Sequence, residues 1–151
     1  MPQFAGSLDA NVVLRLLLND VPDQHAAAVG LIDGADAPFR VSDMAVIEVV
    51  FVLSRHYEFN RAAVAEAING LMSLTEIDSN HTLFERALPM FTEHPKLSFE
   101  DCCMAAYAEL SSAIPLWTFD KKLATQADSA RLTSSSRLKP GDSNLLDRLE
   151  Q

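Results

Sequence analysis

The most apolar stretch of the chain is residues 44–53 (MAVIEVVFVL), in which Glu48 is the only charged residue. A helix through this stretch would be apolar on nearly every face, which predicts that it lies inside the domain. An ionised carboxylate there costs several kcal/mol unless a cation meets it, and the stretch itself contains no Lys or Arg. Glu48 is therefore expected to be protonated, to pair with a distant base, or to face a metal ion.

Along the rest of the chain, short apolar segments alternate with longer segments of helical spacing. The pattern predicts strands at residues 4–8, 39–41, 75–77, 115–119 and 130–133. It predicts helices at residues 11–19, 22–32, 44–53 (with Ser42 as a possible N-cap), 61–74, 81–93 (interrupted or kinked at Pro89), 99–110, 121–127 and 143–150. This alternation indicates a single α/β domain over residues 1–151, with a parallel sheet covered by helices on both faces.

Composition narrows the class of protein. With 48% apolar and 22% charged residues, the chain is typical of an ordinary globular domain. The longest uncharged apolar runs are about ten residues, too short to span a bilayer, and the N-terminus shows no signal-peptide pattern. We therefore expect a cytoplasmic protein without membrane contact. The adjacent Cys102 and Cys103 are expected to pack within a helix rather than to form a disulfide or a zinc site.

The net charge of −9 argues against a protein that coats nucleic acid through bulk electrostatic attraction. It is consistent with an acidic cluster that binds cations, or with a basic protein partner.

Acidic residues stand where a parallel sheet places its functional site, beyond the carboxyl ends of the strands. Asp9 follows the first predicted strand and Asp120 follows the fourth. Both also suit helix N-caps. The spacing Ser98-x-x-Asp101 matches a capping box, which accounts for Asp101, and acids such as Glu100 favour the first turn of a helix. Each acid alone thus has a structural explanation.

Taken together, however, the acids require a common explanation. Asp9, Glu48, Asp120 and one acid of the Glu100–Asp101 pair would repel one another if they met at a sheet edge without a cation. Oxygen ligands with no nearby Cys or His select Mg²⁺ or Mn²⁺. Such ions polarise phosphoryl oxygens and lower the pKa of bound water, which is the chemistry of phosphodiester hydrolysis.

Four blocks in chain order, SLDANVVL, RVSDMAVIEVVFVLSR, LSFEDCCMAAYA and LWTFDKKLA, resemble the PIN-domain family, most closely the VapC-like toxin ribonucleases. The resemblance covers the whole chain. It implies that the catalytic and metal-binding residues are Asp9, Glu48, Asp101 and Asp120. Asn11 would lie beside the first acid, and Thr118 would stand in the threonine-x-aspartate form of the fourth block; both would orient the carboxylates. Cys102–Cys103 departs from the small or aliphatic residues usual after the third acid.

The resemblance also implies a three-layer Rossmann-like PIN fold, with a short, mostly parallel central sheet flanked by helices. It implies Mg²⁺- or Mn²⁺-dependent cleavage of RNA by a type II toxin, a homodimer, and a small cognate antitoxin protein. Arg15, Arg55, Lys121 and Lys122 are candidate contacts to RNA phosphates, or simply solvated surface residues.

Other functions remain open at this point. A PIN-like fold could bind RNA or a protein without cutting. A haloacid-dehalogenase-type phosphatase would have a second acid after its first strand, where this chain has Asn11. A response-regulator receiver would have an acidic pair there and a lysine after its last strand, which the pattern does not show. A metal-dependent ribonuclease is therefore the main hypothesis.

Overall fold

The computed structural model describes residues 2–151, whose strands fall into two parallel ladders. A three-stranded sheet contains β1 (Gly6–Ser7), β2 (Phe39–Arg40) and β3 (Ile77–Asp78), and a two-stranded ladder contains β4 (Leu116–Thr118) and β5 (Ala130–Leu132). The helices are α1 (Ala10–Leu17), α2 (Pro22–Asp33), α3 (Asp43–Arg55), α4 (Arg61–Met72), α5 (His81–Glu93), α6 (Phe99–Leu110), α7 (Lys121–Gln126) and α8 (Asn144–Leu149).

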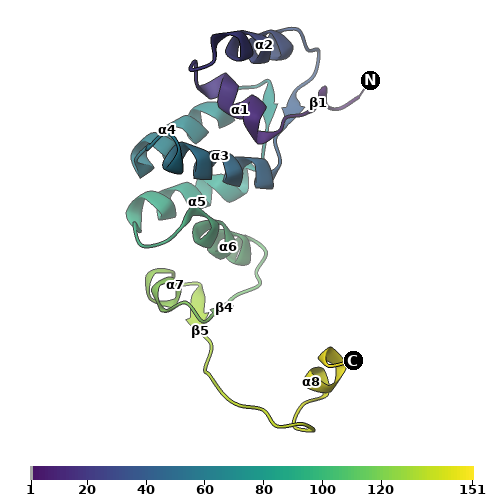
Figure 1. Ribbon diagram of the computed structural model, residues 1–151, viewed down its shortest axis with the longest axis vertical. Helices are drawn as coiled ribbons and strands as arrows, with labels where there is room; N and C mark the ends of the chain where they lie inside the picture. The colour runs from purple at the N-terminus through teal and green to yellow at the C-terminus, as the bar shows by residue number, and fades with distance from the viewer. Residues whose placement is uncertain (1) are drawn as a thin grey trace.

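The predicted α/β class with a parallel sheet is confirmed. The order of the first sheet is β1-β2-β3, and Gly6 lies opposite Phe39, which lies opposite Ile77. The fourth and fifth strands do not extend this sheet within the described part of the chain; they pair only with each other, with Trp117 opposite Arg131. In Figure 1, β4, β5 and α7 lie on the far side of α3, α5 and α6 from β1, and the tail that carries α8 extends beyond them.

Local capping sets the helix boundaries. The Ser42 hydroxyl accepts a hydrogen bond from the Ala45 N–H at the start of α3 (3.2 Å), and Gly34 ends α2 as predicted. Ser98 opens α6, which runs over the predicted residues 99–110. The α5 helix continues through Pro89 rather than being interrupted there. None of the helices in residues 2–151 is long and apolar enough to cross a membrane.

The core lies between the three-stranded sheet and the helices α1 and α3–α6. Phe84 of α5 is fully buried, and its ring stacks at 6.0 Å on Phe99 of α6. Phe91 meets the same ring edge-on at 5.3 Å. This aromatic cluster fixes α6 against α5.

The prediction that the apolar stretch of α3 is buried on nearly every face is wrong. Its inward face is buried, but Met44 is 79% exposed, Phe51 is 50% exposed, and Glu48 is also exposed. These three residues are spaced by four and three positions, so they share one face of the helix. The neighbouring helices cover the other side of α3 only. The Glu48 carboxylate is therefore solvated, and its position alone requires neither a counter-ion nor a metal.

Candidate active site

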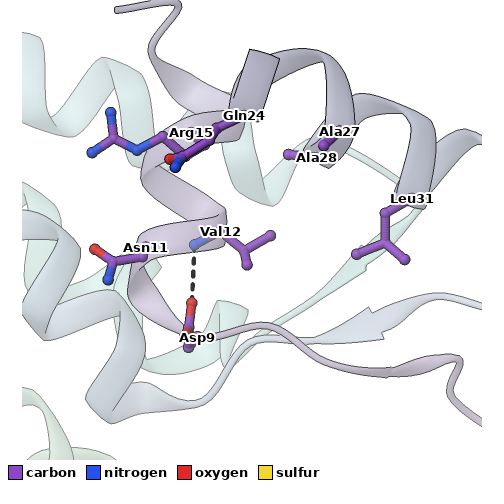
Figure 2. A pocket seen from close by; sticks show the side chains of 8 residues that line it. All are labelled: Asp9, Asn11, Val12, Arg15, Gln24, Ala27, Ala28 and Leu31. Atoms are coloured by element: carbon purple, nitrogen blue, oxygen red, sulfur yellow. Dashed lines mark hydrogen bonds between the residues drawn. The ribbon is translucent and has the colours of Figure 1, made fainter. Parts of the chain in front are cut away.

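Asp9 joins β1 to α1 at the carboxyl end of the three-stranded sheet. Its side chain is the N-cap of α1, and Oδ1 accepts a hydrogen bond from the Val12 N–H at 3.0 Å (Figure 2). Asp9 and Asn11 line a pocket of about 300 Å³ between α1 and α2, together with Arg15 and Leu31. The first predicted acid is thus exposed and held in a fixed orientation.

Arg15, a candidate phosphate contact, already has an anionic partner. Its guanidinium lies 2.6 Å from Asp20 Oδ1 and 3.5 Å from the Tyr57 hydroxyl, which itself donates to Asp20 Oδ2 at 2.6 Å. The hydrogen bond with Tyr57, followed by that with Asp20, raises the pKa of Arg15. The Tyr57 hydrogen bond, followed by that from Arg15, lowers the pKa of Asp20. Arg15 is therefore already paired with Asp20, so less of its positive charge is available to an RNA phosphate.

The two acids at the start of α6 have different surroundings. Asp101 forms the predicted capping box, in which its Oδ2 accepts from the Ser98 N–H (3.2 Å) and Ser98 Oγ accepts from the Asp101 N–H (3.1 Å). Glu100 instead lines a groove of about 440 Å³ that also contains Asp43 and Cys103. Glu100, and not Asp101, therefore shares this groove with Asp43 of α3.

Asp120 lies at the carboxyl end of β4 and is the N-cap of α7. Its Oδ1 accepts from the N–H groups of Lys122 (2.8 Å) and Leu123 (3.3 Å). Thr118, expected to orient the Asp120 carboxylate, instead accepts a hydrogen bond through Oγ1 from the Asp120 backbone N–H at 2.9 Å. Thr118 therefore positions the backbone of Asp120 and leaves its carboxylate free of that contact.

These acids do not meet within one chain. Across residues 2–151, no three His, Cys, Asp or Glu side chains lie close enough to hold a metal ion together. Asp9 and Asp120 follow β1 and β4, strands of different ladders that lie on opposite sides of α3, α5 and α6 (Figure 1). One copy presents the carboxylates as separate groups.

The chemistry of the individual acids nevertheless suits a hard cation. Asp9 caps its helix through Oδ1, Asp101 through Oδ2 and Asp120 through Oδ1. Among residues 2–151, the second oxygen of each makes no hydrogen bond, so each side chain can cap a helix and bind an ion at the same time. Carboxylate oxygens are the ligands that Mg²⁺ and Mn²⁺ prefer.

Two polar residues near the carboxyl edge were missed by the sequence pattern. Asp43 follows β2 as Asp9 follows β1, and Asn80 follows β3. The Asn80 side-chain amide donates to Asp43 Oδ2 at 3.2 Å. The position of Asp43, just after a predicted strand and the Ser42 cap, could have indicated this residue. An acid there also suits the first turn of a helix, however, which gives it a structural explanation.

The cysteines are structural, as predicted. Cys102 and Cys103 are both buried in α6. Burial raises the pKa of the Cys102 thiol to about 11 and that of the Cys103 thiol to about 12. Both are therefore protonated near neutral pH and are poor nucleophiles and metal ligands.

The remaining basic candidates lie on the surface. The Arg55 guanidinium is 5.9 Å from the centre of the Phe51 ring, on the exposed face of α3 that carries Glu48. Lys121 and Lys122 directly follow Asp120 and are exposed. These three cations are free to approach an anionic ligand near the acids.

Comparison with known proteins gives one finding about family. The PIN domain model matches residues 7–129, from β1 to the residue before β5. Asp9, Glu48, Asp101 and Asp120 all lie within the matched region. No curated protein matches the chain.

Proposed function

Because the chain belongs to the PIN-domain family, we propose that it is a metal-dependent endoribonuclease that hydrolyses phosphodiester bonds in RNA. PIN domains are generally nucleases, which supports this class of reaction. The observation that carries the proposal is the match over residues 7–129 together with the position of Asp9 and Asp120 directly beyond parallel strands. We take the matched region and its tail as one PIN-like domain over residues 1–151.

In this proposal Asp9, Glu48, Asp101 and Asp120 hold one or two Mg²⁺ or Mn²⁺ ions. The ion, when bound, polarises a phosphoryl oxygen and stabilises charge on the attacking and leaving oxygens. The protein supplies orientation: helix N–H groups fix one oxygen of Asp9 and of Asp120, and Thr118 fixes the backbone of Asp120. Asn11 is among the residues that line the same pocket as Asp9, and it would position Asp9 or a bound phosphate.

We further propose that the chain is the toxin of a type II toxin–antitoxin pair and acts as a homodimer. The four sequence blocks that resemble VapC-like toxins support this, and the net charge of −9 suits a basic antitoxin. Induced expression should arrest bacterial growth, and Asp9→Asn should relieve the arrest. Growth arrest by both forms would contradict the toxin role of this site.

The direct test is cleavage of a panel of structured RNAs with Mg²⁺ or Mn²⁺, repeated with EDTA and with Asp9→Asn. Asn retains the N-cap acceptor, so the fold should be unchanged. Activity should fall by more than about 100-fold, because changes in outer-shell groups already cost 10–100-fold. Asp36→Asn, an exposed acid in the loop before β2, is the matched control and should cut normally. Cleavage by Asp9→Asn at the wild-type rate would contradict the assignment.

The second candidate is a catalytically silent PIN-like module that binds RNA or protein. It is favoured by the finding that, within residues 2–151, no three candidate side chains share an ion site in one copy. Such a module would bind RNA equally well with EDTA or as Asp9→Asn, and would cut under neither condition.

A further inference from the structure

Within residues 2–151, the outer strands of both ladders, β1 and β3 in the sheet and β4 and β5 in the two-stranded ladder, each have one unpaired edge. The edges of β1 and β4 matter here because Asp9 and Asp120 follow these two strands. β1 pairs only with β2, and β4 pairs only with β5. In β4, the Leu116 N–H donates to Ser129 O and Thr118 O accepts from the Thr133 N–H, both at 2.7 Å. Neighbouring residues of a strand direct their backbone groups to opposite sides, so those of Trp117 face the open edge. Open edges of this kind are templates for pairing with another chain.

The surroundings of β4 are apolar and uncovered. Trp117 is 60% exposed and Phe119 is 70% exposed, and Ile114, two residues before β4, is also exposed. Two short strands alone are marginally stable in water. The unit formed by β4, α7 and β5, residues 116–132, packs on its own copy through Leu123 and Ala127, which belong to the core. Within residues 2–151, however, the open edge of β4 and the aromatic side chains beside it have no covering surface.

We propose that two copies of the chain exchange this unit, with β4 of each copy pairing in parallel with the free edge of β1 in the other. Within one copy β1 and β4 lie on opposite sides of α3, α5 and α6 (Figure 1). The α6 helix that precedes β4 is fixed to α5 by the Phe84–Phe99 stack. A second copy can reach the β1 edge without disturbing this packing. Because each copy has one free β1 edge and one free β4 edge, the exchange closes as a two-fold dimer.

The exchange would complete the acidic site, and in this respect it rests on the proposed function. Asp9 lies two residues beyond the end of β1, and Asp120 lies two residues beyond the end of β4. In parallel strands paired with Ser7 opposite Thr118, these two acids lie side by side at the same edge. Each site would then take Asp9 and Glu48 from one copy and Asp120 from the other. This explains why one copy holds the acids apart.

Mixing inactive variants tests the shared site. Asp9→Asn and Asp120→Asn should each be inactive alone. After joint unfolding and refolding, half of the dimers are mixed, and one of the two sites in each is intact. We therefore expect about a quarter of the wild-type activity. Failure of this mixture to recover activity, while the wild type cuts RNA, would overturn the exchange and leave the proposed function standing.

The matched control is a mixture of Asp9→Asn and Glu48→Gln. Both residues lie in the same packed part of one copy, since α1 packs on α3. No mixed dimer then contains an intact site, so this mixture should stay inactive. Recovery here would show that Glu48 comes from the other copy and would overturn the proposed division of the site.

A disulfide test is independent of activity. Chains with Ser7→Cys are mixed with chains carrying Thr118→Cys and oxidised; the native cysteines are buried and serve as the wild-type background. Adjacent strands bring such positions within the Cα distance of a disulfide, 4.4–6.8 Å. The exchange predicts a covalent dimer from the mixture. A covalent dimer without RNA cleavage would count against the proposed function alone, and absence of the dimer would overturn the exchange.

The single tryptophan provides a solution probe of the same edge. Trp117 should become shielded from acrylamide quenching as the protein concentration rises and the sedimenting mass doubles. Phe119→Lys, which places a charge beside the edge, should move this transition to higher concentration. Leu31→Lys, on an exposed position of α2, should not. A Trp117 that stays quenchable at all concentrations would overturn the exchange.

Discussion

Residues 6–110 and residues 116–132 are both built from parallel strands and helices, but only the first region has a core of its own. In the first region, Leu53, Ile68 and Phe84 are fully buried. In the second, burial is confined to small or single side chains (Leu123, Ala127, Ser129 and Ala130), while its aromatic residues face solvent. Hydrogen bonds and caps are equally regular in both. Regular secondary structure therefore does not by itself indicate a self-sufficient unit; buried apolar area does.

The largest effect in this comparison is expected from Phe84→Ala. The change removes a fully buried ring that stacks on Phe99, and it should lower the free energy of unfolding by about 3–5 kcal/mol. Urea unfolding followed by circular dichroism measures this. Leu149→Ala, at a position 73% exposed in α8, is the control and should change stability by less than about 0.5 kcal/mol. A loss below about 1 kcal/mol for Phe84→Ala would contradict a core centred on this cluster.

A smaller effect is expected from the helix caps, which allow a matched test between the packed region and the exposed tail. Ser98 caps α6, and Ser143 caps α8 through the Leu146 N–H. Ser98→Ala should cost about 1 kcal/mol of global stability. Ser143→Ala should cost nothing measurable in global unfolding, because α8 contains no buried residue. Equal losses in the two variants would mean that α8 unfolds together with the core.

The elements that could be predicted from sequence are those fixed by local interactions. The α6 helix spans the predicted residues because Ser98 and Asp101 form a capping box within one turn. Gly34 likewise marks the end of α2. The exposure of Glu48 could not be predicted in this way. Whether one face of an apolar helix is covered depends on where distant helices pack, and the sequence of residues 44–53 contains no information about this.

The same distinction between local and long-range determinants applies to the candidate site. That Asp9 and Asp120 follow strands was predictable, because each position is set by its own segment. Whether the two strands become neighbours depends on long-range pairing, which hydrophobic periodicity does not specify. Asp43 was missed for a related reason: its link to Asn80 joins residues 37 positions apart. Mutual positions of site residues are therefore the part that needs the structure.

The smallest effect is expected from the Arg15–Asp20–Tyr57 group, which ties α1 to the end of α3 in the packed region. The Tyr57 hydrogen bond, with that from Arg15, holds the pKa of Asp20 below its ordinary value of 3.8. The ionised carboxylate is thus favoured in the folded state, so its contribution to stability is present above pH 3.8 and is lost as the pH falls below it. Because Asp20 is exposed, the effect is modest.

Tyr57→Phe removes the hydrogen bond from the Tyr57 hydroxyl to Asp20 and keeps the ring. The variant should be slightly less stable than the wild type at pH 6, and the two should converge as the pH falls below 3.8. Urea midpoints between pH 3 and pH 6 measure this, with Asp33→Asn, an exposed acid at the end of α2, as the control. A constant difference across this range would mean that Tyr57 acts through packing alone. Convergence would show that this part of the chain is held by a charge-dependent contact, which the region of β4 and β5 lacks within its described residues.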